Sequence, residues 1–311
     1  MSTSTARSDS RPLFAITLRL LAVALLTGMY AMVKVLEQRG VNLAELCFYR
    51  QLFSIPIIYA WVYNQLGPKG FATDRLGGHA LRTIFGLTSM VLTFASVALL
   101  PLAESTTLGF TAPIFATILS AVILHEKTGI HRWSAVIVGF IGVLIMVQPG
   151  SGGNHFPPLG LAVGIAAAIG VSGVSIILRR LSRTEPSPVI VFWFSVLSLP
   201  PTGLLMFWYG QMHDIQTFVM IFVMATIGGV AQLLITSALR WGPVSIVLPM
   251  DYSSILWATL LGWLLWDNWP GTATWFGAVL IMGSGLYIVW REHKLGLVAR
   301  LKAEADADMR A

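Results

Sequence analysis

Arg50 lies within the stretch LCFYRQLFSI, residues 46–55, where most other side chains are apolar. Its guanidinium stays charged and offers a planar set of N–H donors that can bind a carboxylate or phosphate group in a bidentate manner. An arginine near the centre of a bilayer costs roughly 2.5–3.5 kcal/mol, so it needs a partner. Two interpretations follow. Arg50 faces a cavity and binds an anionic group, or it reaches lipid headgroups or ties its helix to a neighbour.

Asp251 is a second ionisable residue inside an apolar segment, and its short side chain cannot reach a membrane surface from that depth. Together with Ser254, Ala258 and Gly262 it forms a small and polar helical face. Such a face is typical of a cavity wall or of a close contact between helices. The carboxylate could bind a proton or a cationic group, and a structural hydrogen bond to a neighbouring helix is the alternative.

Glu104 belongs to a comparable face, with Thr107 and Thr111 on the following turns. Pro113 interrupts the same segment, and Pro249 interrupts the segment that holds Asp251. Proline has no N–H, so a carbonyl of the preceding turn loses its helical partner. Because interrupted helices in corresponding places of two halves point to a transport site, we expect both breaks to lie at the binding site. A position of Glu104 in the outer membrane interface is the alternative.

Three further residues are candidates for the cavity wall: Tyr30, Gln232 and Tyr252. They complete the predicted substrate-binding site, although each residue type also occurs in ordinary helix packing. Arg19 lies near the end of its helix and is expected to extend toward lipid headgroups. No catalytic residue, cofactor or metal ligand is predicted, because the sequence contains no P-loop, no H-E-x-x-H motif and no cysteine cluster.

These residues belong to a chain that is 56% hydrophobic and only 11% charged, with a mean hydropathy of +0.75. Soluble domains carry roughly 25% charged residues, so the composition predicts an all-α, multi-pass membrane protein. The formal net charge of +6 does not indicate nucleic-acid binding, because the basic residues are scattered over short loops.

A spanning helix needs about 20 mostly apolar residues. Ten segments fit: 13–33, 44–63, 81–100, 102–124, 132–148, 158–178, 188–208, 215–238, 243–265 and 272–290. Lys and Arg collect in alternate connections, whereas the outer loops hold only Lys34 and Arg39. Since basic residues stay on the cytoplasmic side, the N-terminal tail, 1–12, and the C-terminal tail, 291–311, are both predicted to be cytoplasmic.

The stretch QPGSGGNHFPPLG, residues 148–160, is rich in Gly and Pro and lies near the middle of the chain. It predicts a linker, 149–157, between two halves, 13–148 and 158–290, with five helices each. Because five is odd, the second half enters the membrane in the opposite direction. Inverted repeats of this kind recur in secondary transporters.

The segments ALLPLAESTTLGFTAPIFATILSAVILHEK, residues 98–127, and WSAVIVGFIGVLIMVQP, residues 133–149, resemble the drug/metabolite transporter superfamily, specifically its members with two EamA-type repeats. A looser similarity runs from Ala238 to Trp290, where Asp267 replaces the usual glutamate. The resemblance covers about residues 13–290. It implies ten helices around a central cavity, with solute transport as the activity.

We therefore expect a secondary transporter of the bacterial inner membrane that moves a small polar metabolite, amino-acid-like or nucleoside-like, by alternating access. Arg50 would hold a carboxylate, and Asp251 with Glu104 an amine or a coupling proton. Membrane lipids are expected partners, and the small residues Gly160 and Gly164 leave open packing within the chain or a homodimer. The alternatives are a non-transporting membrane scaffold or sensor and an intramembrane enzyme acting on lipid. That enzyme would need paired acids or a histidine cluster, which the sequence lacks.

Overall fold

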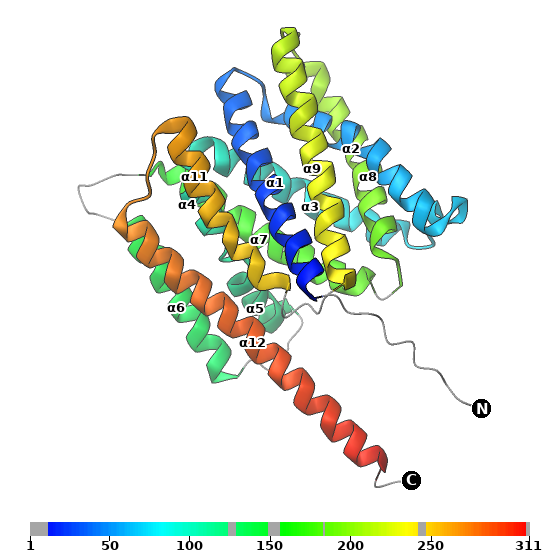
Figure 1. Cartoon of the computed structure of the whole chain (residues 1–311), viewed down its shortest axis with the longest axis vertical. Helices are drawn as coiled ribbons and strands as arrows, with labels where there is room; N and C mark the ends of the chain where they lie inside the picture. Colours follow the sequence, from blue (N-terminus) through cyan, green and yellow to red (C-terminus); the bar gives the residue numbers. More distant parts are fainter. Residues whose placement is uncertain (1–11, 124–128, 149–155, 183, 242–246, 309–311) are drawn as a thin grey trace.

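The computed structural model describes residues 12–123, 129–148, 156–182, 184–241 and 247–308, and all regular elements in these ranges are helical (Figure 1). The first half contains α1 (Pro12–Gln38), α2 (Leu43–Leu66), the 3-10 helix η1 (Pro68–Phe71), α3 (Leu76–Leu99), α4 (Leu102–Gly109), α5 (Ala112–Ile123) and α6 (Ile130–Val147). The second half contains α7 (Pro158–Leu181), α8 (Ser187–Tyr209), α9 (Ile215–Trp241), the 3-10 helix η2 (Leu248–Ser253), α11 (Ser254–Trp266) and α12 (Thr272–Asp308).

Eight segments in the described ranges are long and apolar enough to cross a membrane: Leu13–Gln38, Leu76–Leu99, Leu102–Val122, Ile130–Val147, Pro158–Leu181, Ser187–Tyr209, Ile215–Ala238 and Thr272–Arg291. They confirm a multi-pass helical membrane protein. The predicted spans 44–63 and 243–265 are not among them. Polar side chains, Arg50 included, lower the hydropathy of α2, and α11 has only 13 residues. The count of ten spans therefore stays a prediction.

Both segments that carry a midspan proline are interrupted. α4 ends at Gly109, and α5 begins at Ala112, directly before Pro113. In the second half, Pro249 lies in the first turn of η2, and regular α-helix begins only at Ser254. The interruptions predicted within the segments 102–124 and 243–265 are therefore present in the described residues, and the first segment still forms one candidate span, Leu102–Val122. A proline cannot donate the backbone hydrogen bond that a continuous α-helix requires.

Helices of the two halves pack against one another rather than forming separate bundles (Figure 1). α1 lies along α9, α3 along α7, α2 along α8 and α9, and α6 along α12. Glycines allow the backbones of α6 and α12 to approach closely, since a Cβ on Gly142 would lie 2.9 Å from the carbonyl oxygen of Gly277. The first turn of α1 and the C-terminal part of α12 lie toward the same side of the molecule (Figure 1).

Apolar side chains fill these contacts and also cover the outside. One buried cluster draws on α1, α2, α3 and α9, and a second joins α4, α5 and α6 to α12. On the outer face of α6, Ile137, Ile141 and Leu144 remain exposed. Exposed apolar residues of this kind suit contact with lipid tails, so the core lies between the helices and the outer surface faces the bilayer.

Gly160 and Gly164 of α7 serve packing inside the chain. A Cβ on Gly160 would lie 2.8 Å from the Leu100 side chain, and one on Gly164 would lie 2.6 Å from the Leu108 side chain. Both glycines are buried. They are therefore engaged within one chain, and a homodimer remains a prediction that needs another surface.

Candidate functional site

Three adjoining cavities lie between the halves, and the two helix breaks line two of them. The first, here called the central cavity, has a volume of about 310 Å³ and is lined by residues of α1, α3, α4, α7, α9, η2 and α11. The second, the proline cavity, has a volume of about 340 Å³ and is lined in part by Pro113 and Pro249. The third, the arginine cavity, has a volume of about 170 Å³ and is lined by Arg50 and Arg82.

The cavities share wall residues and so lie next to one another, and we call the three together the chamber. Tyr30 and Thr93 line both the central and the arginine cavity. Phe110 and Asp251 line both the central and the proline cavity. Val171 lines all three. The chamber offers hydroxyl groups and three arginines between mostly apolar walls, which is the usual character of a small-molecule site.

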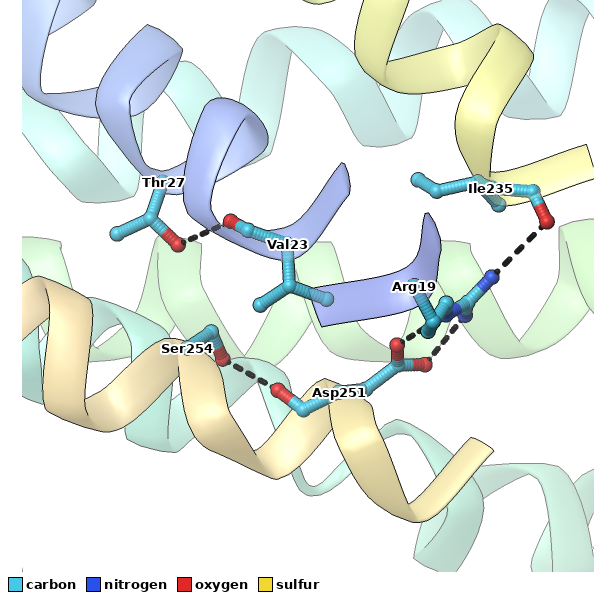
Figure 2. A network of polar contacts seen from close by, with 6 residues as sticks. All are labelled: Arg19, Val23, Thr27, Ile235, Asp251 and Ser254. Atoms are coloured by element: carbon cyan, nitrogen blue, oxygen red, sulfur yellow. Dashed lines mark hydrogen bonds and ion pairs between the residues drawn. The ribbon is translucent and has the colours of Figure 1, made fainter. Parts of the chain in front are cut away.

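Asp251 lies on η2, at the break in its segment, where it forms a bidentate ion pair with Arg19 of α1 (Figure 2). Arg19 Nε lies 2.5 Å from Asp251 Oδ1, and Arg19 Nη2 lies 2.6 Å from Asp251 Oδ2. A third donor, Arg19 Nη1, lies 3.4 Å from the carbonyl oxygen of Ile235 in α9. The pair joins η2 to α1, and it neutralises the charge of Asp251.

This pairing corrects the sequence prediction for Arg19. The residue was expected to extend toward lipid headgroups, but it is buried, with a relative exposure of 6%. The reason is that Asp251, 232 positions away in the chain, lies directly beside it in the wall of the central cavity. The Asp251 side chain keeps 39% of its surface exposed, so its carboxylate remains accessible from the chamber.

Arg50 lies on α2 and faces the arginine cavity, as one of its two predicted roles requires. Its Nη1 lies 2.8 Å from the thioether sulfur of Met90, which is a weak acceptor. Its Nε is buried and has no hydrogen-bond partner among the described residues. Within the same ranges no carboxylate forms an ion pair with Arg50, so no acid there ties the Arg50 side chain to a neighbouring helix.

Arg82 was missed as a site residue: it was counted among the cytoplasmic basic residues, although it lies at the start of the predicted segment 81–100. α3 begins at Leu76, five residues earlier than predicted, so Arg82 lies in its second turn and faces the same cavity as Arg50. Its guanidinium lies 4.1 Å from the ring centre of Phe194 on α8. Nε and Nη1 are buried, and the described residues supply neither with a hydrogen bond. Two features of the sequence could have indicated this position: a helix that starts before residue 81, and the glycine Gly86 one turn after Arg82.

The wall candidates are distributed over the chamber. Tyr30 lines the central and arginine cavities, and Gln232 lines the arginine cavity. Tyr252 lines the proline cavity, where its ring meets Phe110 edge to face at 5.0 Å between centroids. The structure therefore brings Arg50, Gln232 and Tyr30 together and places Tyr252 with Asp251 in another cavity.

Glu104 is separate from these residues and lines none of the three cavities. It is 3% exposed, and its Oε1 accepts a hydrogen bond of 3.1 Å from Thr274 of α12. Oε2 is buried without a partner among the described atoms. Nearby, Lys34 donates to the carbonyl oxygens of Val97 and Leu100 at the C-terminal end of α3. Lys34 was predicted in an outer loop, but it lies within α1 and is buried.

A multi-pass helical protein in which two interrupted helices border a chamber with a few polar groups has the architecture of a membrane transport protein. The EamA-like transporter family matches residues 13–148 and 158–290. The chain therefore belongs to this family, with two of its repeats, and to the drug/metabolite transporter superfamily.

Known relatives agree with this class. The chain is 30% identical to a riboflavin transporter of Vibrio cholerae over 73% of this chain and 76% of that protein. It is 25% identical to an S-adenosylmethionine uptake transporter of Rickettsia prowazekii over 80% of this chain and 84% of that protein. It is 26% identical to a pseudopaline exporter of Pseudomonas aeruginosa over 77% of this chain and 83% of that protein. A solved crystal structure covering 90% of this chain has a TM-score of 0.60 and 16% identity, which shows a shared fold.

Proposed function

We propose that the protein is a secondary transporter that moves a small polar metabolite across the inner membrane by alternating access, with both termini in the cytoplasm. The metabolite is amino-acid-like or nucleoside-like and carries an anionic group that binds Arg50. Movement is driven by the solute gradient or by a coupled proton.

The contacts between helices support two equivalent halves. If α1, α2, α3 and α6 correspond to α7, α8, α9 and α12, then the pair α1–α9 corresponds to the pair α7–α3, and both pairs pack closely. The pairs α2–α8 and α6–α12 join corresponding helices. Alternating access requires this symmetry, because two equivalent halves can exchange conformations and so open one site to either side of the membrane in turn.

One observation carries the choice of substrate group: the guanidinium of Arg50 faces a cavity with a buried Nε that finds no partner in the described part of the chain. A buried charge without a counterion is costly, and the cost falls when an anionic ligand binds. Gln232 and Tyr30 line the same cavity and offer further hydrogen bonds.

Asp251 has a different proposed role because Arg19 already neutralises it. A substrate amine or a proton that binds Asp251 would release Arg19 and so loosen the contact between η2 and α1. Glu104, with one unpartnered oxygen near the outer end of α4, is a second candidate for the coupling proton.

The test is flux into proteoliposomes that contain the purified protein, with labelled amino acids, nucleosides and their derivatives. We expect at least one of these solutes to move, and we expect Arg50→Gln to lower its flux by roughly 100-fold while Arg39→Gln, in an exposed loop, leaves it unchanged. Absence of flux for every solute in both directions, with folded protein in the vesicles, would contradict the proposal. In that case a non-transporting scaffold or sensor is the better account.

A further inference from the structure

We propose that Arg50 and Arg82 together form a binding site for a doubly negative group of the substrate, such as a phosphate monoester or two neighbouring carboxylates. This inference rests on the proposed function and narrows its substrate class. It predicts nucleotide-like rather than nucleoside-like solutes, or dicarboxylic rather than neutral amino acids.

The first argument is the charge of the arginine cavity. Its lining includes two guanidiniums, one from α2 and one from α3, and no carboxylate. Arginine does not lose its charge in proteins. The acid of the adjoining central cavity, Asp251, is already paired with Arg19. Two positive charges in a volume of about 170 Å³ are therefore left for a ligand of opposite charge.

The second argument is the number of unused donors. Arg50 Nε, Arg82 Nε and Arg82 Nη1 are buried, and none of them has a hydrogen-bond partner in the described ranges. Buried polar groups in folded proteins nearly always have partners, so three unpartnered N–H groups beside one cavity indicate a missing acceptor. Phosphate oxygens and carboxylates are the acceptors that match a planar guanidinium.

The third argument is that the surroundings make room for the guanidinium of Arg82. A Cβ on Gly86 of α3 would overlap Arg82 Nη1, so glycine at this position leaves the space free. The ring of Phe194 supports Arg82 from one side by a cation–π contact, which does not supply Nε or Nη1 with a hydrogen-bond acceptor.

The rest of the substrate has a place in the adjoining central cavity. This cavity is about 310 Å³ in volume, and its lining includes the small polar residues Thr27, Thr93, Ser96, Ser105 and Thr106 between apolar side chains. Tyr30 and Thr93 lie where the two cavities meet. A substrate with a dianionic head in the arginine cavity and an uncharged polar body in the central cavity would fill both.

The experiment compares solutes in matched pairs, with the full chain in proteoliposomes: adenosine 5′-monophosphate against adenosine, and glutamate against glutamine. We expect the dianionic or more acidic member of one pair to be transported with a kcat/KM at least about tenfold higher than its partner. Arg82→Gln should remove most of this preference while Arg75→Gln, an exposed arginine next to the start of α3, should leave it intact. Arg82→Lys, which keeps the charge but loses the planar donor set, should give an intermediate value.

A variant-free measurement covers the case in which Arg82→Gln does not fold. A phosphate monoester gains its second negative charge near pH 6, whereas a cyclic phosphate diester keeps a single charge. Binding of adenosine 5′-monophosphate to the wild-type protein, measured by calorimetry, should therefore strengthen between pH 5 and pH 7.5 relative to binding of the cyclic diester.

The outcomes separate the two proposals. Flux of neutral amino acids without a preference for dianions, with the same selectivity in wild type and Arg82→Gln, would overturn the dianion site and leave the transporter proposal standing. Flux of solutes without any anionic group would also contradict the role proposed for Arg50. Equal binding of monoester and diester at all pH values would overturn a site for phosphate monoesters, and a glutamate preference would then assign the site to two carboxylates. Absence of flux for every solute would contradict the proposed function itself.

Discussion

Two regions of the chamber differ in whether their buried arginine has an ion-pair partner. Arg19 forms a bidentate ion pair with Asp251 and adds a contact to the Ile235 carbonyl (Figure 2). Arg50 has only the Met90 sulfur as an acceptor among the described residues, and its Nε remains without a partner. The difference shows which charge stabilises the protein and which is left for a ligand. A paired arginine joins helices, whereas an unpaired one beside a cavity costs stability and gains a partner only when substrate binds.

The largest expected effect on stability comes from breaking the paired side. Asp251→Ala leaves Arg19 buried without its counterion, and we expect this to lower the free energy of unfolding by roughly 2 kcal/mol, between the values for surface and buried pairs. Unfolding by denaturant or heat in detergent measures the loss. Asp74→Ala, at an exposed acid, is the control.

The double variant Arg19→Ala/Asp251→Ala sharpens this prediction. Because it removes both charges, we expect it to be less destabilised than the sum of the two single variants. Strict additivity would mean that the two side chains do not interact, and the description of this region would be wrong.

The next largest effect on stability is expected when the space beside the Arg82 guanidinium is filled. Gly86→Ala places a Cβ against Arg82 Nη1 and Phe194, so we expect a loss of about 1 kcal/mol together with a weaker preference for dianionic solutes. Gly77→Ala is the matched control on the same helix, because a Cβ there meets nothing within 4 Å. If both variants were equally stable and equally selective, Gly86 would not shape the site.

The smallest effect on the free energy of unfolding is expected for Arg50, which has no ion-pair partner among the described residues. Arg50→Met keeps the length of the side chain and removes a charge that lacks a counterion, so the free energy of unfolding should stay the same or rise by up to about 1 kcal/mol. Transport should be lost in the same variant. Thermal unfolding and flux on one preparation test both statements, and a destabilisation as large as that of Asp251→Ala would show that Arg50 has a structural partner.

The sequence predicted the helical membrane fold because long apolar runs have few other stable forms. It also located the two helix breaks, since Pro113 and Pro249 remove backbone donors wherever they lie in a helix. Arg50 could be singled out because a charge is conspicuous in an apolar segment. These inferences depend on local sequence alone.

Other features depend on how helices are rotated and on which ones become neighbours. The ion pair of Arg19 and Asp251 joins residues 232 positions apart, and no local pattern indicates it. Arg82 lies close to a helix end, and a start five residues earlier than predicted moves it from the first turn of the helix to the second, where it lines the arginine cavity. Glu104 shares a polar face with Thr107, but that face turns toward α12 through Thr274 and away from the three cavities.

The most direct test of the account is the charge preference of thiol labelling inside the chamber. In a variant that lacks the native Cys47, Thr93→Cys would place a thiol where the central and arginine cavities meet. Ser254→Cys would place one near the neutral pair of Arg19 and Asp251. We expect a negatively charged methanethiosulfonate reagent to label Thr93→Cys roughly tenfold faster than a positively charged one, and Ser254→Cys to show no such preference. Equal rates at Thr93→Cys, or no labelling by either reagent, would contradict an open chamber with two unpaired arginines.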